Sequence, residues 1–238
     1  MVGEDDGVAE VVGEALTDGI GVGLGKRNKW PDDYFSTYYE LGYKYYDVVN
    51  DTRFPIFSKG FANDISLQQT IQRTSVSAPT YPQGGSNFVF LAKATLPYTL
   101  FSDKDYTNAS DQEKYKYLEY YRLKFTAEWF LPLSKDKKLI LMPRIGFGYL
   151  GSYNKSKGIS PFERYAMGGS GLSGGVNQIG GISILALRGY EDQAISSRGG
   201  DPIVAKYTLE LRYPISLNPQ ATFFALANIP GAFERLRR

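Results

Sequence analysis

Residues 121–131 read Tyr-Arg-Leu-Lys-Phe-Thr-Ala-Glu-Trp-Phe-Leu, and this stretch decides the fold class. Apolar or aromatic side chains stand at the odd positions from 121 to 131, whereas polar or charged side chains stand at the even positions from 120 to 128. Successive side chains of an extended chain point to opposite faces. A period of two therefore predicts a β-strand with one apolar face and one polar face.

The same alternation recurs along most of the chain. Several of the alternating segments run past the five or six residues that are usual in globular strands. With 118–131 they predict an all-β chain of about eight strands. The other segments are 20–26, 35–48, 63–74, 86–97, 138–150, 203–213 and 221–227.

Strand length and connection length together favour a membrane barrel over a soluble β-sandwich. A sandwich also alternates, but its strands are usually shorter, whereas a tilted membrane strand needs about 9–11 residues. Short turns at 79–85 and 134–137 contrast with long polar loops at 49–61, 99–117 and 151–202. Short turns on one rim and long loops on the other are typical of outer-membrane barrels. We therefore predict a transmembrane antiparallel β-barrel.

Composition excludes several function classes. The chain has no Cys and no His, which removes thiol nucleophiles, disulfides, His-based triads and most zinc sites. We therefore expect no enzyme, no metal site and no cofactor. Lys and Arg are interleaved with acids, and the net charge is only +2, so nucleic acid is not an expected partner. No run reaches the roughly 18 apolar residues that a spanning helix needs.

The two ends of the chain depart from the alternating pattern. Residues 1–18 are acidic and lack the basic and apolar regions of a signal peptide. Because a secreted protein needs such a signal, we expect a piece of a longer precursor. The sequence predicts a poorly specified segment at 1–18, a partial barrel domain at 19–227 and an aberrant tail at 228–238.

A long insert at about 152–202 interrupts the strands and closes on Leu187-Arg188-Gly189-Tyr190. Loops longer than about 15 residues are uncommon unless they are functional or disordered. An arginine here suggests a charge that reaches inward to meet a partner. On spacing alone a second interpretation stays open, in which Arg188 is a surface arginine and Glu210 is one of many lumen acids.

Five motifs, taken in order, resemble the barrel of the BamA-type outer-membrane assembly factors, the bacterial surface antigen family. Their details are similar to the Bacteroidetes branch, and the match runs from about residue 20 to residue 227. The motifs are Trp30-Pro31-Asp32-Asp33-Tyr34-Phe35, Tyr81-Pro82 with Gly84-Gly85-Ser86, Pro161-Phe162-Glu163 with Gly168-Gly169, Leu187-Arg188-Gly189-Tyr190, and Leu209-Glu210-Leu211-Arg212-Tyr213-Pro214.

The resemblance implies a 16-stranded barrel, within the range of outer-membrane barrels, of which this chain would cover about the middle half. It also implies that the loop at 152–202 enters the lumen and that Arg188, followed by Gly189 and Tyr190, forms a salt bridge with Glu210. Leu187 replaces the valine usual in the family. A second acid is expected just beyond Ala227, where the sequence departs from the family.

The function implied by the resemblance is the folding and insertion of β-barrel proteins into the bacterial outer membrane. The implied partners are the outer-membrane lipid bilayer, unfolded β-barrel substrates and accessory lipoproteins of an assembly complex. The chain alone would be a non-autonomous fragment, because both seam strands lie outside it. The alternatives are a two-partner-secretion-type transporter pore and a passive porin, although a porin would lack the Arg188 motif with Glu210.

Overall fold

The computed structural model describes residues 14–51, 54, 56–78, 81–101, 105–170, 181–217 and 220–233. Eight long strands form one sheet in the order β1-β2-β3-β4-β5-β6-β9-β10, and every neighbouring pair is antiparallel. The all-β prediction and the expected number of strands are thus confirmed. The strands are β1 (Glu14–Arg27), β2 (Phe35–Val49), β3 (Gly60–Thr74), β4 (Gly85–Thr95), β5 (Tyr121–Pro132), β6 (Ile140–Gly151), β9 (Ile203–Leu217) and β10 (Gln220–Phe233).

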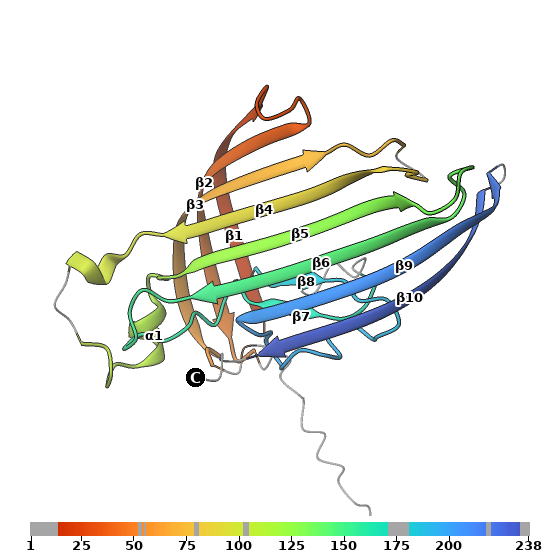
Figure 1. Cartoon of the computed structure of the whole chain (residues 1–238). Coiled ribbons are helices and arrows are strands. Elements are labelled where there is room, and N and C mark those ends of the chain that lie inside the picture. The colour runs from red at the N-terminus through yellow and green to blue at the C-terminus, as the bar shows by residue number, and fades with distance from the viewer. Residues whose placement is uncertain are drawn as a thin grey trace, which may run out of the picture.

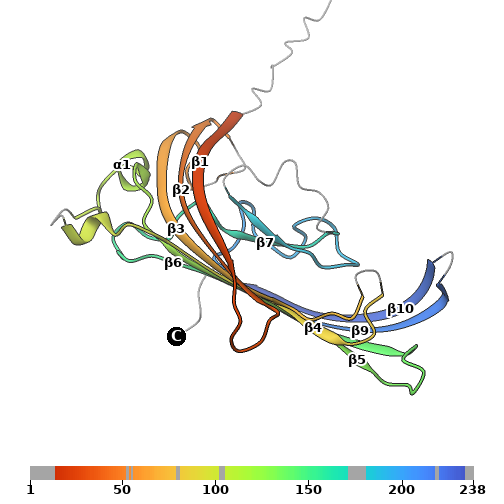
Figure 2. The ribbon, with the colours of Figure 1, turned by 90° about the horizontal axis from the view of Figure 1, so that it is seen from above.

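The sheet is strongly curved and does not close on itself (Figure 1). Viewed from above it is an open trough, with β1 to β3 rising on one side and β9 and β10 curling up on the other (Figure 2). The connections β1–β2, β3–β4, β5–β6 and β9–β10 lie on one rim, and the connections β2–β3, β4–β5 and β6–β9 lie on the opposite rim. The two longest connections, at 96–120 and 152–202, share that second rim, whereas β2–β3 (50–59) is no longer than β3–β4 (75–84). Long loops gathered on one rim agree with the arrangement predicted for a transmembrane barrel.

The register between neighbouring strands places apolar side chains next to one another on the convex face and charged side chains next to one another on the concave face. Phe125 of β5 lies opposite Phe90 of β4 and Phe147 of β6 on the convex face. Lys93 of β4 lies opposite Arg122 of β5 on the concave face. The convex face exposes large apolar side chains, as a lipid-facing surface requires. Among the described residues, no helix is long and apolar enough to cross a membrane.

The long connections carry four short elements. They are the 3-10 helix η1 (Tyr98–Phe101), the helix α1 (Asp111–Tyr115), and the parallel strands β7 (Tyr165–Met167) and β8 (Ser183–Leu185). The hydroxyl of Ser110 accepts a hydrogen bond from the Glu113 amide at 3.4 Å and caps α1. Figure 2 shows β7 on the concave side of the sheet.

The main buried cluster lies between the sheet and the β6–β9 connection (residues 152–202), which is called the long connection below. Tyr46 and Val48 of β2 and Leu150 of β6 contribute from the sheet. Phe162 and Leu187 contribute from the long connection. The core of this molecule is therefore the contact between a barrel wall and a loop packed on its concave face.

Both predicted domain boundaries need correction. β1 begins at Glu14, so residues 14–18 belong to the sheet, whereas residues 1–13 lie outside the described part. β10 stays paired with β9 as far as Phe233 opposite Ile203, so residues 228–233 are strand and not an aberrant tail. Pro230 interrupts the sequence pattern but is tolerated, because an edge strand can lack one ladder donor. Residues 234–238 lie outside the described residues.

Candidate functional site

The long connection is seated on the sheet by an aromatic contact at Phe162. This side chain is fully buried and stacks on Tyr46 of β2, with ring centroids 4.4 Å apart. Phe54 and Phe57, from the β2–β3 connection, pack on the same ring at 5.4 and 5.5 Å. Such pairs contribute about 0.5–1.5 kcal/mol each beyond the area that they bury. Phe162 therefore packs the long connection against both β2 and the β2–β3 connection.

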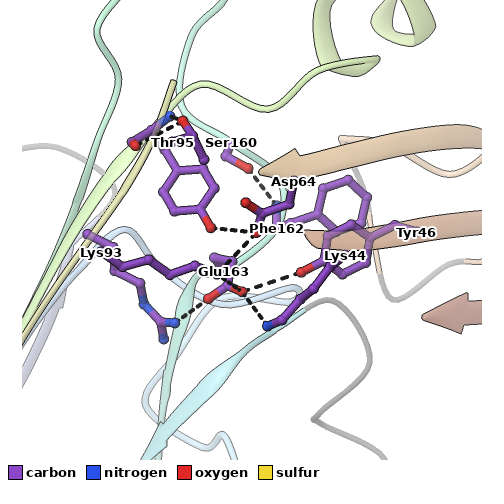
Figure 3. A network of polar contacts seen from close by, with 10 residues as sticks. Lys44, Tyr46, Asp64, Lys93, Thr95, Ser160, Phe162 and Glu163 are labelled. Atoms are coloured by element: carbon purple, nitrogen blue, oxygen red, sulfur yellow. Dashed lines mark hydrogen bonds and ion pairs between the residues drawn. The ribbon is translucent and has the colours of Figure 1, made fainter. Parts of the chain in front are cut away.

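Glu163, the next residue, is the centre of a buried ionic network (Figure 3). Its carboxylate accepts from the Lys93 ammonium at 2.7 Å and from the Lys44 ammonium at 3.0 Å. Arg122 donates to its second oxygen, and the Tyr46 hydroxyl donates to the first at 3.3 Å. One loop carboxylate is thus held by side chains from β2, β4 and β5.

The network extends to β3 through Asp64. This fully buried carboxylate accepts from Lys93 at 3.1 Å and from the Tyr120 hydroxyl at 2.7 Å. Lys93 therefore bridges Asp64 and Glu163. Four consecutive strands or their ends contribute to one cluster, because inward positions of neighbouring strands stand side by side.

Burial raises the pKa of Glu163, but Arg122, Lys93 and Lys44 outweigh it and hold the pKa at about 2. The carboxyl group is consequently ionised over the whole physiological range. Removing a partner from a buried, hydrogen-bonded charge is costly, typically about 3–5 kcal/mol. Within the network Glu163 is therefore a charged partner of Arg122, Lys93 and Lys44.

Tyr165 forms a third point of contact. Its ring lies against Gly148 of β6, where an added Cβ would come within 2.8 Å of the ring atoms. The Arg122 guanidinium stands 4.7 Å from the ring centroid. The Tyr165 hydroxyl donates to the Leu123 carbonyl at 2.7 Å. Gly148 is thus needed for close approach of the loop.

The predicted motif residues lie at the other end of the long connection. Arg188 is exposed, and its guanidinium stands 5.5 Å from the centroid of Phe224 on β10. Its carbonyl accepts from the Asn228 side chain at 3.0 Å. Gly189 adopts a φ of +88°, which favours glycine. Tyr190 is exposed, at 40%.

Glu210 of β9 is buried, but its ion pairs are not with Arg188. The carboxylate accepts from Arg212 at 2.5 Å and lies 3.5 Å from Arg144 of β6. Both arginines share its inward face, Arg212 two residues further along β9 and Arg144 on the neighbouring strand. Arg188 and Glu210 line one cavity of about 120 Å³. Within the described ranges the expected salt bridge between them is not formed, because the nearer arginines engage the carboxylate.

The Glu163 network was not assigned from the sequence. Pro161-Phe162-Glu163 contributed only to the resemblance, and Lys93 and Arg122 read as ordinary inward positions. The available signal was the register, which places Lys93 beside Arg122 and leaves two neighbouring cations without an acid between them. The described residues contain no group of three or more acidic, Cys or His residues that could hold a metal ion.

Three comparisons place the chain among known proteins. A search of curated proteins found no match. Among solved structures the fold resembles BamA from Haemophilus ducreyi lacking POTRA domains 1–3, with a TM-score of 0.65 and 19% identity. That match covers 91% of this chain and 42% of the other, so the chain spans less than half of that BamA chain. The model of the Omp85 superfamily domain matches residues 14–229. The chain therefore belongs to the Omp85 superfamily of bacterial outer-membrane proteins, with a sheet that forms part of a BamA-like barrel.

Proposed function

We propose that this chain is part of an assembly factor that folds and inserts β-barrel proteins into the bacterial outer membrane. The observation that carries the proposal is the long connection packed on the concave face, with Arg188 and Glu210 around one cavity. A passive porin keeps its lumen open to water, whereas here the long connection packs on the concave side of β2, β4, β5 and β6. The BamA-like fold of the sheet supports the same proposal.

The work in this proposal is strand exchange and not covalent chemistry. An unfolded substrate would add its strands to an open edge of the barrel by β-augmentation. The convex face would contact outer-membrane lipid, and accessory lipoproteins would complete the complex. No catalytic residue and no cofactor are needed, and the absence of Cys and His from the sequence fits this view.

A transporter pore of the two-partner-secretion type is the second candidate. It is favoured by the same observation, since such a pore would also carry a docked loop with an Arg-Gly-Tyr motif. The two candidates differ in what fails when the motif is damaged. An assembly factor affects many outer-membrane barrels, whereas a secretion pore affects the export of one partner.

The test is Arg188→Ala in the native protein that contains this chain. We predict reduced folding of outer-membrane barrels with unchanged insertion of the variant itself. The substitution removes the guanidinium beside Phe224 and keeps the backbone carbonyl that accepts from Asn228. The amounts of folded outer-membrane proteins are measured in membrane fractions. Lys155→Ala, which removes another exposed cation of the same connection, is the matched control.

Normal barrel assembly in the Arg188→Ala strain would contradict the role given to this motif. Normal assembly with loss of one secreted partner would favour the transporter instead.

A further inference from the structure

We propose that side chains on the concave face of β2 to β5 form a binding site for one carboxylate, which we call the receptor. Glu163 is the positioning residue that occupies this receptor and so docks the long connection onto the sheet. The receptor consists of Lys44, Lys93, Asp64 and Arg122 on four consecutive strands. The receptor is separate from the Arg188 motif. The inference applies equally to an assembly factor and to a secretion pore.

The first argument for the receptor is the charge on the concave face of the sheet. Without the loop, the receptor has three cations and only one carboxylate, that of Asp64. With the loop docked, two of the cations, Lys93 and Arg122, are only 5% and 6% exposed. Buried charges are retained in proteins when they are paired. Glu163 supplies the missing carboxylate, and among the described residues it alone forms ion pairs with all three cations.

The second argument is the backbone conformation of Glu163. Its φ is +61°, a left-handed conformation that residues other than glycine seldom adopt. Such a conformation persists where the surroundings determine it strongly, and it often marks a functional position. Space has also been kept for the side chain, because a Cβ on Gly181 would lie 2.5 Å from the Glu163 carboxylate. The loop thus adopts an unfavourable backbone conformation in order to present this carboxylate.

The third argument is the position of the Glu163 network on the sheet. Glu163 is held by β2, β4 and β5, whereas Arg188 lies beside Phe224 on the far strand β10. The two ends of the long connection therefore rest on different parts of the wall. Both parts are anchored by a buried apolar side chain, Phe162 beside Glu163 and Leu187 beside Arg188. The two charged side chains differ, because Glu163 is 1% exposed whereas Arg188 is exposed. It follows that Glu163 is the charged contact that fixes the connection to β2, β4 and β5.

Hydrogen exchange tests the inference in the native protein that contains this chain, extracted in detergent. Glu163→Gly removes the carboxylate and suits the positive φ. The amides of Tyr165 and Ser183 report docking, because they donate to the Asp201 and Arg164 carbonyls within the long connection. We expect these amides to exchange at least about tenfold faster in the variant, while the amides of β2 to β5 keep their protection.

Chemical rescue separates a receptor from a merely structural residue. Added acetate, a free carboxylate, is expected to restore the slow exchange of Glu163→Gly, whereas acetamide, its neutral counterpart, is not. Glu163→Gln keeps the volume of the side chain and is expected to undock the loop as well. Glu191→Gln, an exposed acid of the same connection, is expected to change nothing.

Unchanged exchange in both Glu163 variants would overturn the inference, and so would equal rescue by acetate and acetamide. Should the single variants fail to fold, the double variant Glu163→Gln with Lys93→Gln restores the original charge balance of the network. Recovery of folded protein in the double variant would support the receptor, and failure to recover it would contradict the receptor. Barrel assembly is not measured in this experiment, so its outcome is independent of the proposed function.

Discussion

At Glu163 burial and neighbouring cations act in opposite directions on the same carboxyl group. Burial raises its pKa, while Arg122, Lys93 and Lys44 lower the pKa to about 2, below the ordinary value of 4.5. A pKa that is lower in the folded state stabilises folding at pH values above the ordinary pKa. That stabilisation is lost as the pH falls from about 4.5 towards 2.

We predict that the docked loop is stable at neutral pH and loosens over this acidic range, by about 3 kcal/mol at most. The titratable and charged groups that face Glu163 are Lys44, Tyr46, Asp64, Lys93, Tyr120, Arg122 and Tyr165. The contribution of Glu163 is the difference between the unaltered protein and Glu163→Gln. The urea midpoint in detergent is measured from pH 7 to pH 2. Parallel pH profiles for the two proteins would contradict the prediction.

Gly148 offers a second test at the scale of single residues. A Cβ at this position would lie 2.8 Å from the Tyr165 ring, which Arg122 and the Leu123 carbonyl hold in place. We predict that Gly148→Ala destabilises the docked state by about 1–3 kcal/mol, as overpacking of a filled site does. Urea unfolding in detergent measures the loss.

Gly84→Ala is the control, because nothing lies within 4 Å of a Cβ added there. Alanine fits a strand better than glycine, so a loss at 148 must come from the contact with Tyr165. Equal stability of the two alanine variants would show that the ring is free to move aside.

Single residues were predicted unevenly from the sequence. Glu210 was expected to be an inward acid, and it is buried, but its partners are Arg212 and Arg144. Contacts between residues more than about 100 positions apart, such as Lys44 with Glu163, depend on how the loop folds back. Strand periodicity contains no information about that.

At the scale of elements, alternation along β5 determines which side chains face lipid. Phe125 stands on the convex face between Phe90 and Phe147, and Thr126 faces the concave side. We predict that Phe125→Arg destabilises membrane insertion by about 2–4 kcal/mol, whereas Thr126→Arg costs little, because only the former places a charge in hydrocarbon.

Unfolding from lipid vesicles in urea measures both variants under the same conditions. Thr126→Arg is the matched control for the added charge and size. A similar loss in both would mean that β5 does not separate a lipid face from a polar face.

Strand existence was predicted well, and strand ends less well. All eight alternating segments are strands in the structure. Alternation predicts them because successive side chains of a strand point to opposite faces, and one face is apolar while the other is polar. The ends of β1 and β10 were missed at Glu14 and Phe233. Both are edge strands with one neighbour each in the described structure. On an edge, cross-strand pairing with a single neighbour can extend a strand through residues such as Pro230 that break the pattern.

At the scale of the whole molecule, the wall and the loop stabilise each other. The larger of the two buried clusters combines side chains of the sheet with Phe162, Tyr165, Met167, Leu185 and Leu187 of the long connection. Neither β1 nor β10 has a second strand partner within the described residues. Unpaired edges invite further strands, and a membrane barrel needs every backbone group satisfied. The eight strands are therefore an arc of a larger barrel, in agreement with the 42% coverage of the BamA structure.

The central claim is that the convex face meets lipid and the concave face holds the loop. A cysteine scan of β5 tests it most directly, since the chain has no native Cys to interfere. Single cysteines at Leu123, Phe125 and Ala127, and separately at Lys124, Thr126 and Glu128, are labelled with a fluorophore in vesicles that contain nitroxide lipids. We predict strong quenching at the first three positions and weak quenching at the other three. Quenching that fails to alternate, or that is stronger at the second set, would contradict the account.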